Sequence, residues 1–372
     1  MTRVLVVDDS RFIRRVVDDA LTNAGYDVVT AADGATAVEA VDEHDPDVVT
    51  MDVEMPGMSG IEAVARIMSA APTPVLMLSA DTADGAEATL DALERGAVDF
   101  LPKANTDGRD IDDFAAAVVE KVDDLAAASI SSLALARTTA AAHAAGVAAE
   151  TADRRGVAGT VAREGDAETV ALDGEPSGDP TVVVGASTGG PRIVERLVAT
   201  LPADLGAKLL VVQHMPSEFT ARFAERLDAI SEYEVREARD GDRIGPGEAL
   251  VARGGYHLAV RNNVGGRVRV GLEDGERIHG VRPAIDVTMR TAAERVSDPL
   301  CGVVLSGMGR DGAAGIEAVK EAGGRTIAQD ERTSPVFGIP AKAIETGRVD
   351  EVVPAEGVAE SIVDAFDTEG ER

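Results

Sequence analysis

Short runs rich in Val, Leu and Ile alternate with amphipathic segments of helical period through the first 122 residues. The apolar runs are too short for helices and lack the polar alternation of half-buried strands, so they are predicted to be strands covered on both faces. Parallel strands need helical crossovers, and this chain supplies a helical segment after each strand. The pattern predicts a doubly wound parallel sheet, and the same alternation resumes from Thr181 to about Phe366.

The composition changes between these two regions. Residues 123–179 are rich in Ala, Gly, Thr and charged residues and contain few large apolar side chains. Such a segment cannot bury a core, so it is predicted to be a long linker. The fold class is therefore α/β, with one parallel-sheet domain over residues 1–122 and a second, with an added antiparallel portion, over residues 180–366.

The formal charge of −30 excludes whole classes of partner. A strongly acidic surface repels nucleic acid and anionic membranes, so neither is expected as a partner. The simplest interpretation is a solvated acidic coat, which would suit a high-salt cytosol because salt screens self-repulsion. That hypothesis predicts a stability that rises with molar KCl.

Targeting and redox features are sparse in this sequence. The single cysteine, Cys301, excludes an internal disulfide, and its apolar neighbours predict a buried thiol. The N-terminus shows no signal peptide, and no apolar run is long enough to span a bilayer. A cytoplasmic protein without membrane insertion is expected.

Polar side chains follow the predicted strands of the first region, at the edge where parallel strands end. Asp8 and Asp9 follow the first strand and Asp52 ends the third, while Ser79 and Lys103 end the fourth and fifth. Ligand sites in open α/β sheets form along this edge. A single Asp there is commonly a helix N-cap, but five such positions favour a site. Three neighbouring carboxylates need raised pKa values or a cation, and their oxygens suit Mg²⁺.

These positions resemble the response-regulator receiver domain, and the likeness over residues 1–122 rests on VDDS, MDVEMPGMSG, LSA and DFLPK. The resemblance implies a flavodoxin-like fold in which a histidine kinase phosphorylates one aspartate. It also implies Mg²⁺ as the cofactor of phosphorylation. The implied roles are phosphorylation for Asp52, Mg²⁺ ligation for Asp8, Asp9, Asp52 and the carbonyl of Glu54, and switching for Ser79, Phe100 and Lys103.

The stretch TVVVGASTGGP, residues 181–191, places a glycine-rich turn between a β-branched strand and a helix that begins near Pro191. Such a turn either cradles a phosphate or holds a nucleophile. A dinucleotide fingerprint would need glycine at Ser187 and an acid after the next strand, where Gln213 and His214 stand. The match to G-x-S-x-G favours Ser187 as a nucleophile beside a helix N-terminus that can support an oxyanion. The phosphate cradle stays as the alternative.

A nucleophilic serine needs a base, and His214 directly follows an apolar strand at the same predicted sheet edge. His257 and His279 lie in glycine-rich segments and are predicted to be structural or to face substrate. A carboxylate should orient the base, and Asp311 in LSGMGRDGAAG is the candidate. Its alternative role is N-cap of a helix beginning near Ala313, although the catalytic role is preferred.

A second resemblance, to the catalytic domain of the CheB chemotaxis methylesterase family, covers about residues 180–366. It rests on VGASTGGP, VVQHMP, GDRIGPGEALVARGGYHL, RPAIDVTMRTAA, LSGMGRDGAAG and AQDERTSPVFGIPAKAI. The family usually has Thr where this chain has Ser306, a change that keeps the hydroxyl. The implied roles are nucleophile for Ser187, general base and then acid for His214, orienting carboxylate for Asp311, and lining of the oxyanion site for Thr188 and the main chain around Met308.

The resemblance also implies a reaction, its control and its partners. The substrate would be a γ-glutamyl methyl ester on the cytoplasmic helices of a methyl-accepting chemoreceptor, with deamidation of receptor Gln to Glu as a second reaction. A chemotaxis histidine kinase would supply the phosphoryl group, and the unphosphorylated receiver would pack across the active-site edge. The catalytic domain is Rossmann-like and would need no cofactor. Two other interpretations stay open: a nucleotide-binding module without chemistry, and a receiver-linked hydrolase of small esters.

Overall fold

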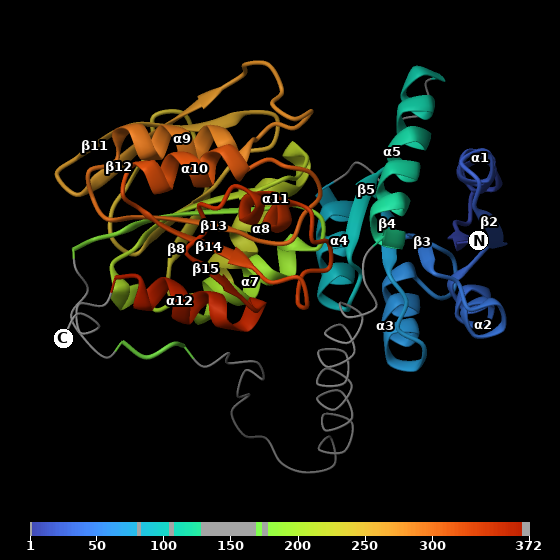
Figure 1. Cartoon of the computed structure of the whole chain (residues 1–372). Coiled ribbons are helices and arrows are strands. Elements are labelled where there is room, and N and C mark those ends of the chain that lie inside the picture. Colours follow the sequence, from blue (N-terminus) through green and yellow to red (C-terminus); the bar gives the residue numbers. More distant parts are fainter. Residues whose placement is uncertain (1, 80–82, 104–107, 128–168, 173–177, 367–372) are drawn as a thin grey trace, which may run out of the picture. The chain divides into compact units, whose positions relative to one another are not determined.

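The computed structural model forms two compact units, which divide the chain between Asp166 and Ala167. Each unit is an α/β structure on a parallel sheet, as the sequence pattern predicts (Figure 1). Within the described residues, no helix has the length and apolar character needed to cross a membrane. Most of the linker expected over 123–179 lies outside the described residues. The structure describes residues 2–79, 83–103, 108–127, 169–172 and 178–366.

The first unit is a five-stranded sheet with strand order β2-β1-β3-β4-β5, and all its pairs are parallel. Helix α1 packs against α5, while α2 contacts α3 and α3 contacts α4. The strand order reverses between β1 and β3, where ligand sites form in such sheets. The elements are β1 (Arg3–Val7), α1 (Arg11–Asn23), β2 (Asp27–Ala31), α2 (Gly34–His44), β3 (Val48–Asp52), α3 (Gly60–Ala70), β4 (Val75–Ser79), α4 (Ala83–Glu94), β5 (Asp99–Pro102) and α5 (Gly108–Ala127).

Helix α1 shows how the sequence pattern becomes structure. It buries Ile13, Val17 and Leu21, which are spaced by four residues and so lie on one helical face. Ser10 caps its N-terminus by accepting a hydrogen bond from the N–H of Ile13, and Gly25 follows it with a φ of 97° that favours glycine. The cap and the glycine explain why the helix ends where the sequence indicates.

The second unit is a seven-stranded sheet with strand order β15-β14-β13-β6-β7-β10-β8, and its pairs are parallel. Strand β6 is central, between β13 and β7. The strands are β6 (Thr181–Ala186), β7 (Lys208–Gln213), β8 (Glu234–Glu237), β10 (Glu248–Val251), β13 (Leu300–Val304), β14 (Arg325–Gln329) and β15 (Glu351–Val353), and the helices are α7 (Gly190–Thr200), α8 (Ser217–Ile230), α9 (Ile285–Arg295), α10 (Ala313–Glu321), α11 (Ile339–Glu345) and α12 (Val358–Asp364), with 3₁₀ turns at Ala203–Leu205 and Ala355–Gly357.

An antiparallel three-stranded sheet adds to this unit, as the sequence predicts. Its strand order is β11-β12-β9, from β9 (Arg243–Ile244), β11 (His257–Val264) and β12 (Arg267–Glu273). Helix α9 packs on β11 and on α10 over one face of the large sheet, and α7 with α12 lies on the other (Figure 1). The small sheet and α9 thereby position the segment that precedes α9 near the C-terminal edge of the large sheet.

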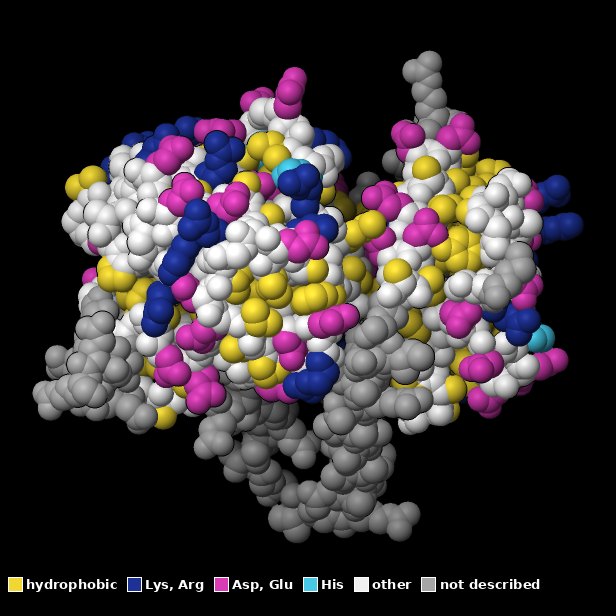
Figure 2. Space-filling model, in the orientation of Figure 1, with side chains coloured by type: hydrophobic (Ala, Val, Ile, Leu, Met, Phe, Trp, Pro, Cys, Tyr) yellow, Lys and Arg dark blue, Asp and Glu magenta, His cyan; other side chains and the backbone are white. Residues whose placement is uncertain are grey.

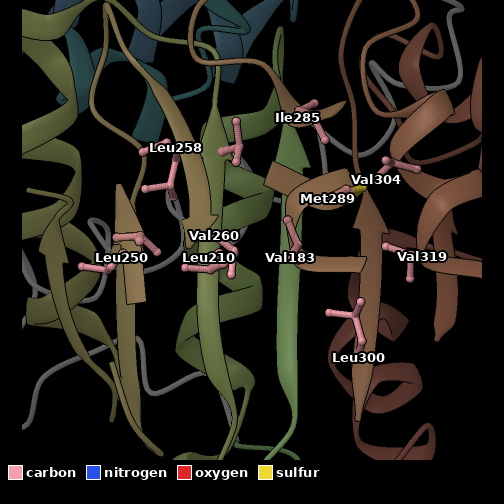
Figure 3. Packing of buried hydrophobic residues seen from close by; sticks show 14 of the residues in the cluster. Val183, Leu210, Leu250, Leu258, Val260, Ile285, Met289, Leu300, Val304 and Val319 are labelled. Carbon is pink, nitrogen blue, oxygen red and sulfur yellow. The ribbon is translucent and has the colours of Figure 1, made fainter. Parts of the chain in front are cut away.

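The core of the second unit lies between the large sheet and the layer of α9, α10 and β11. Figure 3 shows its residues coming from neighbouring strands and from both helices, among them Val183, Leu210, Val260 and Met289. All four are fully buried. Burying each such side chain stabilises the fold by roughly 1.5–3 kcal/mol. The packing therefore fixes α9 and α10 on the large sheet, next to the ends of β6 and β13.

The structure shows the acidic surface and the buried cysteine that the sequence predicts. Asp and Glu side chains spread over the visible surface of both units, with Lys and Arg among them (Figure 2). Cys301 is fully buried, and burial raises the pKa of its thiol far above the ordinary value. The predicted buried thiol is confirmed.

Candidate functional site

The predicted nucleophile lies in a tight turn after the central strand. Ser187 follows β6 directly, and its N–H donates to the carbonyl of Ser306 at 3.0 Å. Gly189 has a φ of 73° and directly precedes α7. A Cβ at Gly189 would lie 2.6 Å from Pro335 Cβ, so both the backbone and the space require glycine. Helix α7 begins at Gly190, one residue before the predicted start.

Ser187 and the predicted base leave neighbouring strands at the same level. The parallel register of β6 and β7 pairs Ala186 with Gln213, and the N–H of His214 donates to the carbonyl of Ala186 at 3.0 Å. Adjacent strands are about 4.8 Å apart, so the two residues that follow them are close. Ser187 is buried and His214 is half-buried. The structure therefore brings the predicted nucleophile and base together.

The predicted carboxylate reaches the base from the other side of β6. Asp311 follows β13, and its Oδ2 lies 2.9 Å from His214 Nε2. Burial by itself raises the pKa of Asp311, but the hydrogen bond and charge of His214 and two main-chain N–H groups outweigh it and lower that pKa. Asp311 is thus ionised at neutral pH, and an ionised carboxylate only accepts, so the proton of the shared hydrogen bond is on Nε2.

The N-cap alternative for Asp311 was wrong about which helix it caps. Helix α10 begins at Ala313, as expected, but Asp311 does not cap it. Asp311 instead accepts hydrogen bonds from the N–H groups of Ile285 at 2.7 Å and Asp286 at 3.0 Å, which begin α9. The antiparallel layer brings α9 to this edge, which the sequence does not reveal.

Asp286 makes the reciprocal contact with the start of α10, and sequence reasoning did not single out this residue. Its Oδ1 accepts from the N–H groups of Gly312 at 2.9 Å and Gly315 at 2.7 Å, so it caps α10. His279 Nε2 lies 2.9 Å from its other oxygen. Asp286 and Asp311 therefore cap each other's helices, and the first-turn acid in RPAIDV was the available signal. The contact of His279 with this helix-capping carboxylate supports the structural one of its two predicted roles.

A third turn borders the nucleophile. A Cβ at Gly307 would lie 2.7 Å from Ser187 Cβ, so the main chain after β13 packs directly on the serine. Ser306 Oγ donates to the carbonyl of Thr188 at 2.8 Å, and Thr188 is buried. Met308 is 42% exposed, and its N–H has no acceptor among the described residues. That N–H is free to serve an oxyanion near Ser187.

The first unit gathers three carboxylates and one ammonium at its own sheet edge. Asp8 and Asp52 are buried and Asp9 is exposed, and each offers an oxygen within 4.8 Å of the others. Lys103 Nζ lies 2.8 Å from Asp8 and 2.7 Å from Asp52. The four residues, predicted from the ends of three strands, therefore lie together.

Burial and neighbouring charges set the protonation of this cluster. Burial raises the pKa of Asp52 to about 6, and the charge of Asp8 adds to the rise while Lys103 opposes it. Burial disfavours the charged form of Lys103, but hydrogen bonds and ion pairs with Asp52 and Asp8 outweigh it and raise its pKa. The cluster therefore holds excess negative charge that a single ammonium does not fully offset.

The remaining predicted receiver residues lie in or directly beside the strands that end at this cluster. The N–H of Glu54 donates to Asp52 at 3.3 Å, and Phe100 is buried in β5. Ser79 Oγ donates to the carbonyl of Gly85 at 3.1 Å and lies 2.7 Å from Thr89 Oγ1. Its hydroxyl thus contacts α4, the helix that follows β4.

The acidic cluster fits a hard divalent cation. Asp8 Oδ2 is buried, and among the described residues no hydrogen bond of acceptable geometry reaches it, although the ammonium of Lys103 is near. Three carboxylates with an unsatisfied oxygen match the ligand preference of Mg²⁺. The second acidic group, His279 with Asp286 and Asp311, differs because its carboxylates are already hydrogen-bonded to N–H groups.

Comparison with known proteins assigns both units. Residues 4–113 match the response regulator receiver domain, and residues 182–362 match CheB methylesterase. A relative from Halobacterium salinarum, named protein-glutamate methylesterase/protein-glutamine glutaminase, is 50% identical over 98% of this chain and 99% of its own. The chain belongs to the CheB methylesterase family. An Archaeoglobus fulgidus relative of the same name is 42% identical over 97% of each chain.

Solved structures of the family match each unit separately. The CheB methylesterase catalytic domain of Thermotoga maritima is 42% identical and covers 50% of this chain and 98% of its own, with a TM-score of 0.48. The response regulator domain of the same protein is 45% identical and covers 33% of this chain and 94% of its own, with a TM-score of 0.31. The family-model matches and the full-length relatives confirm the receiver and methylesterase resemblances stated from the sequence.

Proposed function

We propose that this protein hydrolyses γ-glutamyl methyl esters on methyl-accepting chemoreceptors, deamidates receptor glutamines to glutamates, and so supports chemotactic adaptation. The relatives named protein-glutamate methylesterase/protein-glutamine glutaminase align with this protein over nearly the full length of both chains. The observation that carries the proposal is the 2.9 Å contact of His214 with Asp311 beside the strand end that holds Ser187. In both reactions the serine attacks the side-chain carbonyl carbon, and the product on the receptor is a glutamate carboxylate.

In the proposed mechanism, Ser187 Oγ attacks the ester carbonyl and His214 accepts its proton. Because Asp311 keeps a proton on Nε2, Nδ1 is the ring nitrogen available to Ser187. The imidazolium that forms is stabilised by the ionised Asp311. It then donates its proton to the leaving group, which gives methanol from the ester or ammonia from a glutamine amide. Water hydrolyses the acyl-enzyme with His214 again as base.

The developing oxyanion needs donors that are fixed before the reaction. The N–H of Met308 has no acceptor among the residues that the structure describes, and α7 begins at Gly190, shortly after Ser187. Both lie at the edge where the tetrahedral intermediate would form, and Thr188 lines it. Losing one such donor typically costs about 10²–10³ in kcat.

The receiver unit is proposed to control this activity through phosphorylation of Asp52. Asp8, Asp9, Asp52 and the carbonyl of Glu54 would hold Mg²⁺, which when bound neutralises charge on the phosphoryl oxygens. Lys103 already contacts two of the carboxylates and would pair with the phosphoryl group. A chemotaxis histidine kinase is the proposed donor, and both proteins would act in the cytoplasm.

Methanol release from a methylated chemoreceptor fragment tests the proposed reaction. Ser187→Ala should abolish release, whereas Ser231→Ala, which removes a hydroxyl bonded to Leu227 at the end of α8, should not. Acetyl phosphate should raise the rate of the wild type. Hydrolysis of p-nitrophenyl acetate without methanol release would favour a small-ester hydrolase instead.

Deletion of residues 1–150 tests the proposed control. The truncated protein should release methanol at a rate that acetyl phosphate does not change. A truncated protein that still needed acetyl phosphate would contradict control by the receiver.

A further inference from the structure

The sheet brings the proposed nucleophile and base close, but no side-chain hydrogen bond joins them. Among the described residues, the ring of His214 bonds only to Asp311, and Ser187 Oγ makes no hydrogen bond. The spacing of the two groups therefore depends on the main chain of the turns that follow β6 and β7. One main-chain hydrogen bond, from the N–H of His214 to the carbonyl of Ala186 at 3.0 Å, already joins those turns.

One buried carboxamide links the two turns. Gln213 Nε2 donates to the carbonyl of Ser187 at 2.9 Å and makes a longer contact of 3.4 Å with the carbonyl of His214. A carboxamide carries two N–H donors, so one group can serve both carbonyls. The carbonyl of Ser187 also accepts from the N–H of Gly190 at 2.8 Å, which closes the turn into α7.

We propose that Gln213 is a positioning residue for the hydrolysis, because its carboxamide ties the main chain of Ser187 to that of His214 and sets the spacing of nucleophile and base. This inference rests on the proposed function of Ser187 and His214. Gln213 acts only through their main chains and does not touch the reacting atoms.

The surroundings of Gln213 favour positioning over stability. Its side chain is 1% exposed, and its Oε1 is buried without a hydrogen-bond partner among the described residues. An unpaired buried carbonyl is destabilising, and an apolar side chain of the same size would avoid it. Rotating the amide would not help, since Oε1 would then face two carbonyl oxygens. The presence of a carboxamide at this position is therefore best explained by the N–H groups that it donates to the two carbonyls.

The carboxamide also has little freedom to move. A Cβ at Gly190 would lie 2.6 Å from Gln213 Oε1 and 2.7 Å from Ala186 Cβ. The amide group is thus confined between the end of β6 and the first turn of α7. A rigid donor of this kind can hold the turns within the few tenths of an ångström that a reactive geometry needs.

Gln213→Leu tests the proposal in the full-length protein with the methylated receptor fragment. We expect kcat to fall about 10- to 100-fold while KM stays within about twofold, because substrate binding does not involve Gln213. Labelling of Ser187 by a fluorophosphonate should slow by a similar factor. The acidic limb of the pH profile of kcat should keep its midpoint, because the His214–Asp311 pair is intact.

Two further variants make the test specific. Gln213→Glu keeps the size but replaces the donors by acceptors, so its kcat should fall at least as far. Thr181→Val removes a buried hydroxyl that has no hydrogen-bond partner among the described residues, at the opposite end of β6, and should leave kcat and KM unchanged. Thermal unfolding of all variants should stay within a few degrees of the wild type.

Certain results would overturn the proposal. A kcat for Gln213→Leu within twofold of the wild type would show that Gln213 only fills space. If that variant does not fold, Gln213→Met replaces it and the same criterion applies. A loss of kcat in Thr181→Val equal to that in Gln213→Leu would also reject positioning. Full activity of Ser187→Ala would refute the proposed function instead, so the two failures are distinguishable.

Discussion

The two units place their reactive side chains at the same edge of a parallel sheet, yet they offset negative charge in different ways. In the receiver unit, Asp8 and Asp52 share the ammonium of Lys103, and burial raises the pKa of Asp52 to about 6. In the catalytic unit, Asp311 accepts from two main-chain N–H groups and from His214, and its pKa is lowered. The two units share the parallel-sheet topology, but they differ in the hydrogen-bond donors that reach their buried carboxylates.

The difference indicates what each carboxylate can do. A carboxylate with too few donors, such as Asp52, is stabilised when a cation or a phosphoryl group arrives, so it suits a reversible modification. A carboxylate whose oxygens are bonded, such as Asp311, is a fixed charge that orients a neighbour without reacting. The following predictions, from the largest effect to the smallest, test this contrast.

Asp311→Asn should produce the largest effect. The amide can donate to His214 Nε2, which favours the wrong tautomer, so kcat for methanol release should fall roughly 10³–10⁴-fold. Asp350→Asn is the matched control, because Asp350 is another carboxylate with a lowered pKa, bonded to Thr326 and Lys320. A kcat for Asp311→Asn within tenfold of the wild type would break the contrast.

Asp52→Asn should abolish phosphorylation by acetyl phosphate and Mg²⁺, and with it the rise in methanol release. Basal release should stay unchanged, since the proposed catalytic residues are untouched. Asp33→Asn, which alters the cap of α2, is the control and should still be phosphorylated. Incorporation of labelled phosphate measures the result, and label on Asp52→Asn would contradict it.

Asp286→Ala should lower kcat by about tenfold or more and the free energy of unfolding by roughly 2 kcal/mol, because buried N–H groups of Gly312 and Gly315 lose their acceptor. Asp286→Asn keeps an acceptor for both and should lose much less. Kinetics and urea unfolding of both variants measure these effects. Equal losses in the two variants would show that charge, rather than the caps, is what matters.

The raised pKa of Asp52 predicts a pH-dependent stability of the receiver unit. The folded value of about 6 exceeds the ordinary 3.8, so the folded state binds the proton more tightly and loses stability as the pH rises through this range. Without Mg²⁺ at pH 7.5, Asp52→Asn should therefore be more stable than the wild type by roughly 2–3 kcal/mol.

This stability difference should shrink as the pH falls from 7.5 to 5, and it should also shrink when Mg²⁺ is added. Hydrogen exchange of peptides from β1, β3 and β4 in urea measures it. A difference that stays constant with pH would mean that Asp52 is not the titrating group.

Local patterns predicted much of the fold. The apolar runs and amphipathic segments indicated the strands and helices of the receiver unit, and Ser10 and Gly25 marked the limits of α1. Strand neighbours are harder to predict, because they depend on the packing of the whole chain. Nothing local shows that Val304 of β13 pairs with Gly185 of β6, more than a hundred residues earlier.

The sites show the same limit. Ser187 and His214 could be expected at one sheet edge because each follows a predicted strand, and they meet because β6 and β7 are neighbours in the structure. The contact between Asp311 and the start of α9 could not, because the antiparallel layer that carries α9 to this edge has no sequence signal of its position. In the sequence, Gln213 indicates only that a ribose-binding acid is missing at its position. Its contact with the Ser187 carbonyl, which suggests a role, is visible only in the structure.

The central place of β6 in its sheet has a consequence for heat inactivation. Edge strands open first in local unfolding, and here the edges are β15 and β8, each separated from β6 by two other strands. The proposed triad comes from the ends of β6, β7 and β13, which form the middle of the sheet. Fraying at the margins should therefore leave the esterase working, and its loss on heating should coincide with melting of the whole unit.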